Sequence, residues 1–173
     1  GDAPDCSRFS LERLHLGMTL VEARAAVPTC DINPVPILGD DVYRIEPRPS
    51  PGEKKKAGQV FAQVDGKTTI LRAPAGVLER ITVNYSDVPG ETLRAAFRER
   101  FGEPAVDTIS RQAHVAGKEA LWASDECDAL VHVVTGRDFR YGGIGGSPVA
   151  RAELERKSKI DAKLNAAKSK VKF

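Results

Sequence analysis

The chain has 173 residues, of which 41% are hydrophobic and 29% charged, and its formal net charge at pH 7 is +2. This length and composition fit one globular domain with its own core, and they exclude a collagen-like, a wholly disordered or an integral membrane protein. The charge is uneven, because residues 149–173 hold eight basic and three acidic side chains, whereas the rest of the chain holds 18 and 21. The sequence therefore predicts a slightly acidic body with a basic tail, and no specific binding of nucleic acid.

The first predicted helix begins after Thr19. Thr19 is a favourable N-cap residue, and Glu22 follows three residues later, which is the spacing of a capping box. Apolar residues then recur at helical spacing up to Val27, and Pro28 ends the helix.

A proline-rich segment follows this helix. Residues 31–58 hold five prolines and end near a run of three lysines. Proline cannot donate a backbone hydrogen bond, so this composition predicts a long surface loop, with one short strand at Val42–Ile45.

The central part of the chain predicts strands and a second helix. Asp65-Gly66 is a strong signal for a hairpin turn between two alternating runs. The predicted strands cover 59–64, 68–73, 78–85, 105–115, 118–123 and 129–135, and the second helix covers 89–101. In the third of these strands, Ile81, Val83 and Tyr85 are assigned to the core. The fold class is therefore α+β, with helices packed on one face of an antiparallel sheet.

The tail is predicted to be a basic helix. Four glycines within 137–147 indicate a flexible connector, and from Pro148 onward the composition is typical of a helix. This divides the chain into a single domain, 1–147, with its loop at 31–58, and a C-terminal helix, 148–173. The apolar stripe of this helix consists of Ile160, Leu164, Ala167 and Val171, surrounded by lysines. We expect the helix to dock lightly on the body or to pack on a neighbouring molecule, and an ordinary C-terminal helix with solvated lysines is the alternative. Removing residues 149–173 is then expected to leave the body folded.

Motifs for catalysis, metals or cofactors are not recognisable. Ser147 does not lie in a GxSxG sequence, and the acidic neighbours of Cys127 disfavour a reactive thiolate. The three histidines have no carboxylate at metal-ligand spacing. The sequence therefore predicts no cofactor, no metal site and no catalytic residue.

The three cysteines predict one disulfide and one free thiol if the protein is exported. We favour Cys6–Cys30, because a chain that turns back at Pro28 brings the two ends of the first helix together. Cys30–Cys127 is the second choice, and three reduced thiols are the alternative.

The segment Phe9–Ala23 contains Leu16-Gly17-Met18-Thr19 and then Glu22. It resembles the module shared by the outer-membrane assembly lipoprotein BamE (the SmpA/OmlA family) and β-lactamase inhibitory protein. The resemblance implies a short helical pair packed on one face of an antiparallel sheet. It also implies a protein that works outside the cytoplasm, binds other proteins and is not an enzyme.

These observations predict a bacterial protein, periplasmic or otherwise exported, that binds another protein or a cell-envelope component through a sheet face. The side chains expected to face away from the core are Phe61, Gln63, Thr82, Asn84 and His132. Two alternatives stay open. One is an enzyme whose site is assembled from distant residues, and the other is an adaptor that contacts a membrane or an anionic polymer through the basic tail.

Overall fold

The computed structural model describes residues 4–53, 62–140 and 142–172. In this part of the chain the helices are α1 (Leu20–Ala26), α2 (Gly90–Phe101), α3 (Lys157–Ser169) and the short 3-10 helices η1 (Pro36–Leu38) and η2 (Pro74–Gly76). The strands are β1 (Ser10–Leu11), β2 (Leu14–His15), β3 (Cys30–Pro34), β4 (Val42–Pro47), β5 (Lys67–Arg72), β6 (Arg80–Tyr85), β7 (Val106–Ile109), β8 (Val115–Ser124), β9 (Ala129–Asp138) and β10 (Ser147–Glu155). The fold is α+β, as the sequence predicts.

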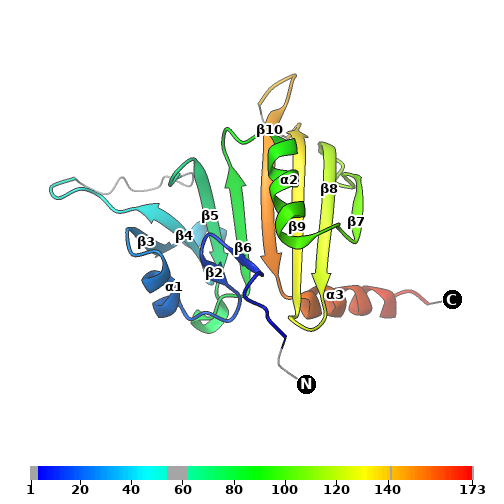
Figure 1. Ribbon diagram of the computed structural model, residues 1–173, viewed down its shortest axis with the longest axis horizontal. Coiled ribbons are helices and arrows are strands. Elements are labelled where there is room, and N and C mark those ends of the chain that lie inside the picture. The colour runs from blue at the N-terminus through cyan, green and yellow to red at the C-terminus, as the bar shows by residue number, and fades with distance from the viewer. Residues whose placement is uncertain (1–3, 54–61, 141, 173) are drawn as a thin grey trace.

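Eight strands form one antiparallel sheet in the order β3-β4-β5-β6-β10-β9-β8-β7, and β1 and β2 form a separate hairpin. The last strand of the chain, β10, lies between β6 and β9 (Figure 1). It therefore joins the two halves of the sheet by hydrogen bonds on both of its edges.

One face of the sheet carries the hydrophobic core, and we call it the core face. Its central row consists of Leu71, Ile81, Leu154, Val131 and Trp122, which are register partners across five strands and are each at most 4% exposed. Helices α1 and α2 and the β1–β2 hairpin lie over this face (Figure 1). Burial of these side chains is the main term that holds the helices on the sheet.

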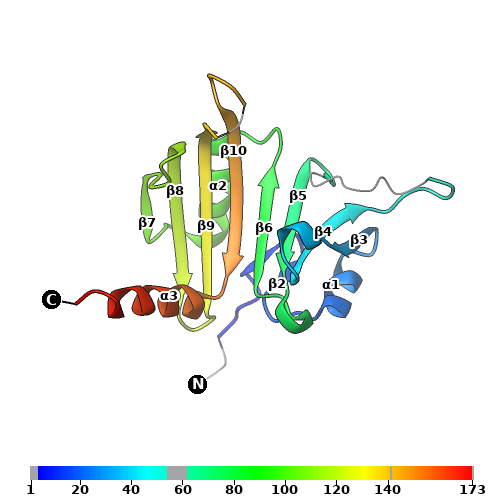
Figure 2. The same cartoon turned by 180° about the vertical axis from the view of Figure 1, so that it is seen from behind.

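The other side of the sheet is called the open face here. Its central row consists of Ile70, Thr82, Glu153, His132 and Leu121. Seen from behind, α3 lies across the lower end of this face, and none of the described helices covers its centre (Figure 2). The predicted arrangement, with helices on one face of an antiparallel sheet, is thus found for α1 and α2.

Both predicted helix starts in the body are close to the observed ones. Thr19 caps α1: its hydroxyl accepts from the Glu22 amide at 3.1 Å, and Glu22 accepts from the Thr19 amide at 3.2 Å. In α2, Leu93, Phe97 and Phe101 are buried at helical spacing. This apolar face packs the helix against the sheet, mainly over β9 and β10.

The largest correction concerns the tail. The sequence predicts a helix from Pro148 onward, but Ser147–Glu155 is β10 and α3 begins only at Lys157. The side chains that β10 buries are Ala150, Ala152 and Leu154. They alternate with polar residues, and this period of two decides the structure although alanine, leucine and glutamate favour helices. The domain therefore extends to Glu155.

The glycines before β10 are part of a hairpin rather than a connector to a separate tail. They lie in the loop between β9 and β10, where the Gly146 amide donates to the Gly143 carbonyl at 3.2 Å. The Arg137 side chain holds the loop by donating to the carbonyls of Gly145 at 2.6 Å and Gly146 at 3.1 Å.

The prediction of a proline-rich loop at 31–58 is also corrected. Its first part contains β3, η1 and β4, so the predicted strand at Val42–Ile45 is present but the strand before it was missed. Pro34 and Pro47 are the last residues of β3 and β4, and β3 is an edge strand. Proline is tolerated at such positions because a donor is not needed there.

The predicted hairpin at Asp65-Gly66 is present as a turn with positive φ angles of 52° and 72°. Val64 and Lys67 form a bridge across it. Ala62 and Gln63 are not in a strand, and residues 59–61 of the predicted strand lie outside the described residues.

Helix α3 is held to the body by polar contacts and has no buried residue. Lys157 Nζ lies 2.8 Å from Asp125 Oδ1, and Lys159 pairs with Glu79. From Asp161 to Lys172 every residue is exposed, and the helix extends past β8 and β7 (Figure 1). The helix thus docks lightly, as predicted. No helix of the described residues is long and apolar enough to span a membrane.

Candidate functional site

Three of the five predicted contact residues lie together on the open face. Thr82 and His132 are the register partners of Glu153 on its two sides, so these three side chains form one row across β6, β10 and β9. Asn84 lies on the same face of β6, opposite Arg151. All of them are partly exposed, so each is available to a partner.

Charged side chains surround this row. Arg80 Nε lies 3.5 Å from Glu153 Oε1, and His132 Nε2 lies 3.4 Å from Glu119 Oε2. On the same strand face, burial and then the charge of Glu153 raise the pKa of Glu155. The open face therefore carries a band of paired charges across its central strands, not a continuous apolar patch.

The other two predicted residues are not part of this row. Gln63 is exposed in the segment before β5, where its amide Nε2 donates to Ser86 Oγ at 3.0 Å. Because Gln63 is not in a strand, the predicted strand alternation does not apply to it. Phe61 lies outside the described residues.

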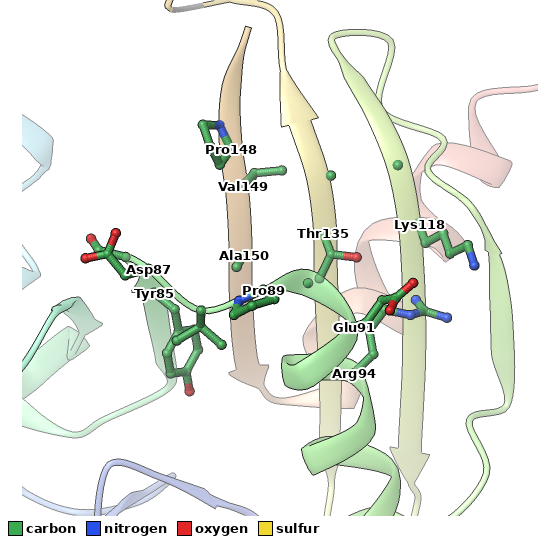
Figure 3. A pocket seen from close by; sticks show the side chains of 15 residues that line it. Tyr85, Asp87, Pro89, Glu91, Arg94, Lys118, Thr135, Pro148, Val149 and Ala150 are labelled. Carbon is green, nitrogen blue, oxygen red and sulfur yellow. The ribbon is translucent and has the colours of Figure 1, made fainter.

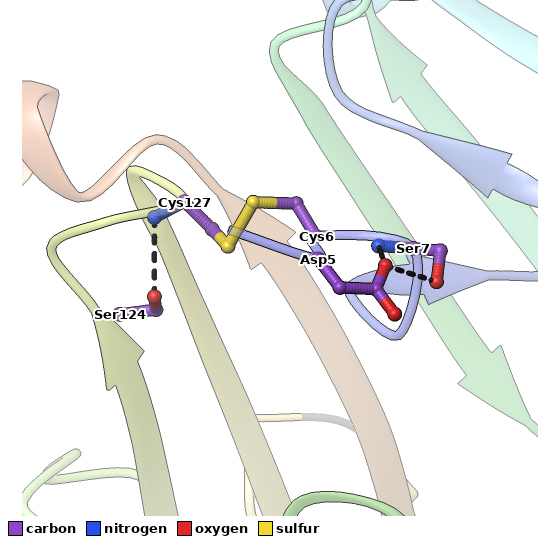
Figure 4. The surroundings of a disulfide bond; sticks show 5 residues. All are labelled: Asp5, Cys6, Ser7, Ser124 and Cys127. Carbon is purple, nitrogen blue, oxygen red and sulfur yellow. Dashed lines mark hydrogen bonds between the residues drawn. A yellow bond between two sulfur atoms is a disulfide. The ribbon is translucent and has the colours of Figure 1, made fainter. Parts of the chain in front are cut away.

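The disulfide joins Cys6 to Cys127, with their Cα atoms 5.5 Å apart (Figure 4). The predicted Cys6–Cys30 pair and the second choice, Cys30–Cys127, are both wrong. Cys30 is a free, half-buried thiol in β3, at one edge of the sheet, whereas Cys127 lies in the turn between β8 and β9, towards the other edge. The N-terminal segment approaches that turn, so Cys6 meets Cys127. A disulfide is compatible with an oxidising compartment.

The structure also has a groove on the core-face side of the sheet, which the sequence does not reveal. It has a volume of about 770 Å³ and lies at the start of α2 (Figure 3). Its floor is formed by β8, β9 and β10, and its walls by the first turn of α2 and the segment that precedes it. Tyr85 lines one end, and burial, followed by the charge of Glu12, raises the pKa of this phenol to about 12.

Three glycines that line the groove allow close approach of its backbone segments. A Cβ on Gly90 would lie 2.9 Å from Thr135 Cβ, so the first residue of α2 can approach β9 this closely only as glycine. Gly117 and Gly136 are register partners in β8 and β9. A Cβ on Gly117 would lie 1.9 Å from the Thr135 carbonyl oxygen, and one on Gly136 would lie 2.2 Å from the Ala116 carbonyl oxygen. Close approach of the two backbones therefore requires glycine at both positions.

Positive side chains gather on the β8 side of the groove. Arg94 Nη2 donates to Asp107 Oδ1 at 2.6 Å, and Arg98 bonds the other oxygen of the same carboxylate. The hydrogen bond from Arg94, followed by the charges of Arg94, Arg98 and Lys118, holds the pKa of Asp107 below its usual value, although desolvation acts in the opposite direction. One carboxylate is thus shared by three cations.

Two polar groups of the groove lack partners within the described residues. Arg94 is 9% exposed, and its buried Nη1 has no hydrogen-bond partner there. Thr135 is 5% exposed and lines the groove beside its register partner Lys118. Its hydroxyl makes no hydrogen bond to any residue that the structure describes. Buried polar groups are normally satisfied, so the unpartnered Arg94 nitrogen is notable. The Thr135 hydroxyl lines the groove and has its hydrogen-bonding capacity available to a ligand there.

Among the residues that the structure describes, no three or more His, Cys, Asp or Glu side chains are arranged to hold a metal ion. Comparison with models of known families, with curated proteins and with solved structures finds no match. The function must therefore be argued from the geometry.

The sequence analysis missed two kinds of residue. Glu153 and Arg151 were assigned to the tail helix, although the alternation around them was a usable signal for a strand. The groove residues Gly90, Lys118 and Thr135 come together only through strand register and helix packing. Their spacing in the chain contains no signal for this.

Proposed function

We propose that this protein is a non-catalytic, exported bacterial protein that binds another protein or a cell-envelope component through the open face. The observation that carries the proposal is that one face of the sheet holds the core and its helices, while none of the helices that the structure describes lies over the centre of the other face. Thr82, Asn84 and His132 lie on that uncovered centre. Its paired charges and half-buried Ile70 and Leu121 give the mixed polar and apolar character that non-obligate protein interfaces share with the rest of a protein surface.

Two observations support the exported location. The Cys6–Cys127 disulfide fits an oxidising compartment, such as the periplasm. The segment Leu16-Gly17-Met18-Thr19 resembles the helix start of the BamE-like module, whose members work outside the cytoplasm. We keep membership of that module as part of the proposal.

The test uses envelope extract from the source cells and three versions of the tagged protein. Thr82→Arg and Asn84→Arg together place two bulky cations on the open face. Ala95→Arg is the matched control, because Ala95 is exposed on α2, on the other side of the sheet. We expect wild type and the control to capture the same partner and the double variant to lose it, with all three showing the same thermal unfolding. Equal capture by all three would contradict the proposal.

A second candidate function is contact with an anionic membrane through α3. The observation that favours it is that Leu164 is 52% and Val171 60% exposed on a segment that extends past the sheet. Within α3, Lys163 and Lys168 flank the apolar stripe of Ile160, Leu164 and Ala167 when the sequence is projected on a helix, which is the arrangement of interfacial helices, and Val171 follows just after the helix ends. Lys168, Lys170 and Lys172 make no ion pair with any described residue.

Sedimentation with vesicles distinguishes this second function from the first. We expect the protein to bind vesicles of equal parts phosphatidylcholine and phosphatidylglycerol, but not phosphatidylcholine alone, and to lose this binding when residues 157–173 are removed. Replacement of Lys54, Lys55 and Lys56 by glutamine is the control for the loss of positive charge. Vesicle binding that persists without α3 would rule out this function.

A further inference from the structure

We propose that the groove at the start of α2 is a binding site for an oxyanion, a carboxylate or a phosphate, carried by a ligand with an apolar part. The groove opens on the core-face side of the sheet and shares none of Thr82, Asn84 or His132. The inference is therefore independent of binding at the open face.

The first argument is the start of the helix itself. Helix α2 has twelve residues, and Pro89 at its N-cap provides no side-chain acceptor. The amides of Gly90, Glu91 and Thr92 therefore have no cap, and the helix dipole adds positive potential at this end. Gly90 and Glu91 line the groove. Uncapped amides at a helix start are a common way to bind a carboxylate or phosphate.

The second argument is the pair of unsatisfied polar groups in the lining. The Thr135 hydroxyl is close to the helix start, because a Cβ on Gly90 would lie 3.4 Å from its oxygen. The Thr135 residue is 5% exposed, and its hydroxyl has no partner in the described part of the chain. Arg94 contributes a buried nitrogen, Nη1, with no partner there. A negatively charged hydrogen-bond acceptor at this point would accept a bond from the Thr135 hydroxyl and complement the charge of the Arg94 guanidinium.

The third argument is charge. Arg94, Arg98 and Lys118 surround the single carboxylate of Asp107, so this side of the groove has an excess of positive charge. Lys118 makes no ion pair within 4.0 Å among the described residues, and its register partner is Thr135. Glu91 at the rim opposes an anion, and its removal should therefore strengthen binding.

The remaining lining defines the rest of the ligand. Val88, Pro148, Val149 and Ala150 form an apolar wall and floor next to the polar end. A volume of about 770 Å³ is in the range of small-molecule sites. The geometry thus fits a small amphipathic anion with its charged head at the helix start and a short apolar chain across β10.

The test is a titration of the ¹⁵N-labelled full chain, followed by amide chemical shifts. Sodium hexanoate, hexylammonium chloride and sodium phosphate are the probes, because the first two share a tail and differ in charge. We expect hexanoate to shift the amides of Gly90, Glu91 and Thr135 saturably, and hexylammonium to leave them unchanged. If phosphate shifts the same amides more strongly than hexanoate does, the preferred head group is a phosphate. If phosphate shifts them more weakly, the preferred head group is a carboxylate. Equal binding of hexanoate and hexylammonium, or no binding of either anion, would overturn the proposal.

Variants then assign the binding to this groove. Thr135→Val keeps the volume and removes the hydroxyl, and we expect it to weaken hexanoate about tenfold, as for the loss of a hydrogen bond to a charged group. Glu91→Gln should bind more tightly. Thr108→Val, a change of the same kind on β7, should have no effect. Hexanoate binding that Thr135→Val leaves unchanged, while the amide spectrum shows an intact fold, would overturn the assignment.

Discussion

Asp128 caps helix α3 from the turn between β8 and β9. The Ser158 amide donates to Asp128 Oδ1 at 2.7 Å, and the Ser158 hydroxyl donates to Oδ2 at 2.8 Å. Arg156, the N-cap residue of α3, has no side-chain cap of its own. Asp128 is also the neighbour of Cys127, so the turn that the disulfide anchors is the one that holds the helix (Figure 4).

Asp128→Ala should loosen α3 without affecting the body. Loss of a capping side chain typically costs about 1 kcal/mol. We expect faster hydrogen exchange of the amides from Ile160 to Ser169 and unchanged exchange in the sheet. Asp125→Ala is the control, because Asp125 is exposed and its ion pair with Lys157 is worth less. Equal effects of the two substitutions would show that the cap is not what holds the helix.

Docking of α3 should weaken on acidification. Burial tends to raise the pKa of Asp128, but the hydrogen bonds from Ser158 and the charges of Arg156 and Lys157 outweigh it and lower the pKa. A carboxyl group with a lowered folded pKa contributes stability that is complete above its unfolded pKa of about 4 and is lost as the pH falls through the folded value.

The measurement is hydrogen exchange of α3 between neutral pH and about pH 3. Asp125 and Glu79 also face the lysines of α3 and titrate in the same range. Asp128→Asn separates their effect from that of Asp128. If this variant and wild type lose protection in parallel on acidification, Asp128 is not the responsible group.

Removal of residues 157–173 should leave a folded body, whereas removal of residues 149–173 should not. The first deletion takes away a helix with no buried residue. The second also takes away most of β10, which pairs with β6 and β9. Circular dichroism during heating tests both: we expect a cooperative transition for the shorter deletion and none for the longer one. This revises the expectation from sequence, in which the longer deletion is harmless.

The native, non-reduced protein should have one titratable thiol, Cys30. Replacing Cys6 and Cys127 by serine should lower the free energy of unfolding by about 4–5 kcal/mol in the chain-entropy model, because the bond spans a sequence separation of 121 residues. Urea denaturation measures this, and Cys30→Ser is the control. Three reactive thiols in the untreated protein would contradict the disulfide.

Gly136→Ala should be strongly destabilising, by about 3 kcal/mol or more, because its Cβ would meet the backbone of β8 and its φ of 133° disfavours other residues. Gly145→Ala is the matched control. A Cβ there has its nearest neighbour at 3.9 Å, the end of the Arg137 side chain. Thermal denaturation of both variants measures the difference, and a Gly136→Ala protein as stable as the control would mean that the two strands are further apart.

Local signals in the sequence were sufficient for the helices of the body and for the sides of several strands. Thr19 and Glu22 are a capping box that needs no distant partner, and Ile81 and Val83 alternate with polar neighbours. For β10 two local signals conflict, helix propensity and alternation. The conflict is resolved by the two strands that flank it, which are far away in the chain.

In the candidate sites, too, local patterns identified some residues, whereas others depend on distant parts of the chain. Thr82 and Asn84 were placed on the correct side because one strand's alternation determines their direction. Their neighbour Glu153 was not found, because it depends on where β10 inserts. The pairing of Cys6 with Cys127 depends on the path of the N-terminal segment across the sheet, and the spacing of cysteines contains no information on that path.

The bond between Cys6 and Cys127 makes a covalent ring of everything from the N-terminal segment to the end of β8, and it leaves β9 and β10 outside. A single proteolytic cut anywhere in the ring leaves one covalently connected molecule until the disulfide is reduced. A cut in the loop between β9 and β10 instead separates β10 and α3 from the rest of the chain. After such a cut, hydrogen bonds and packing alone retain the strand at the centre of the sheet. The protein's tolerance of proteolysis therefore changes abruptly at residue 127.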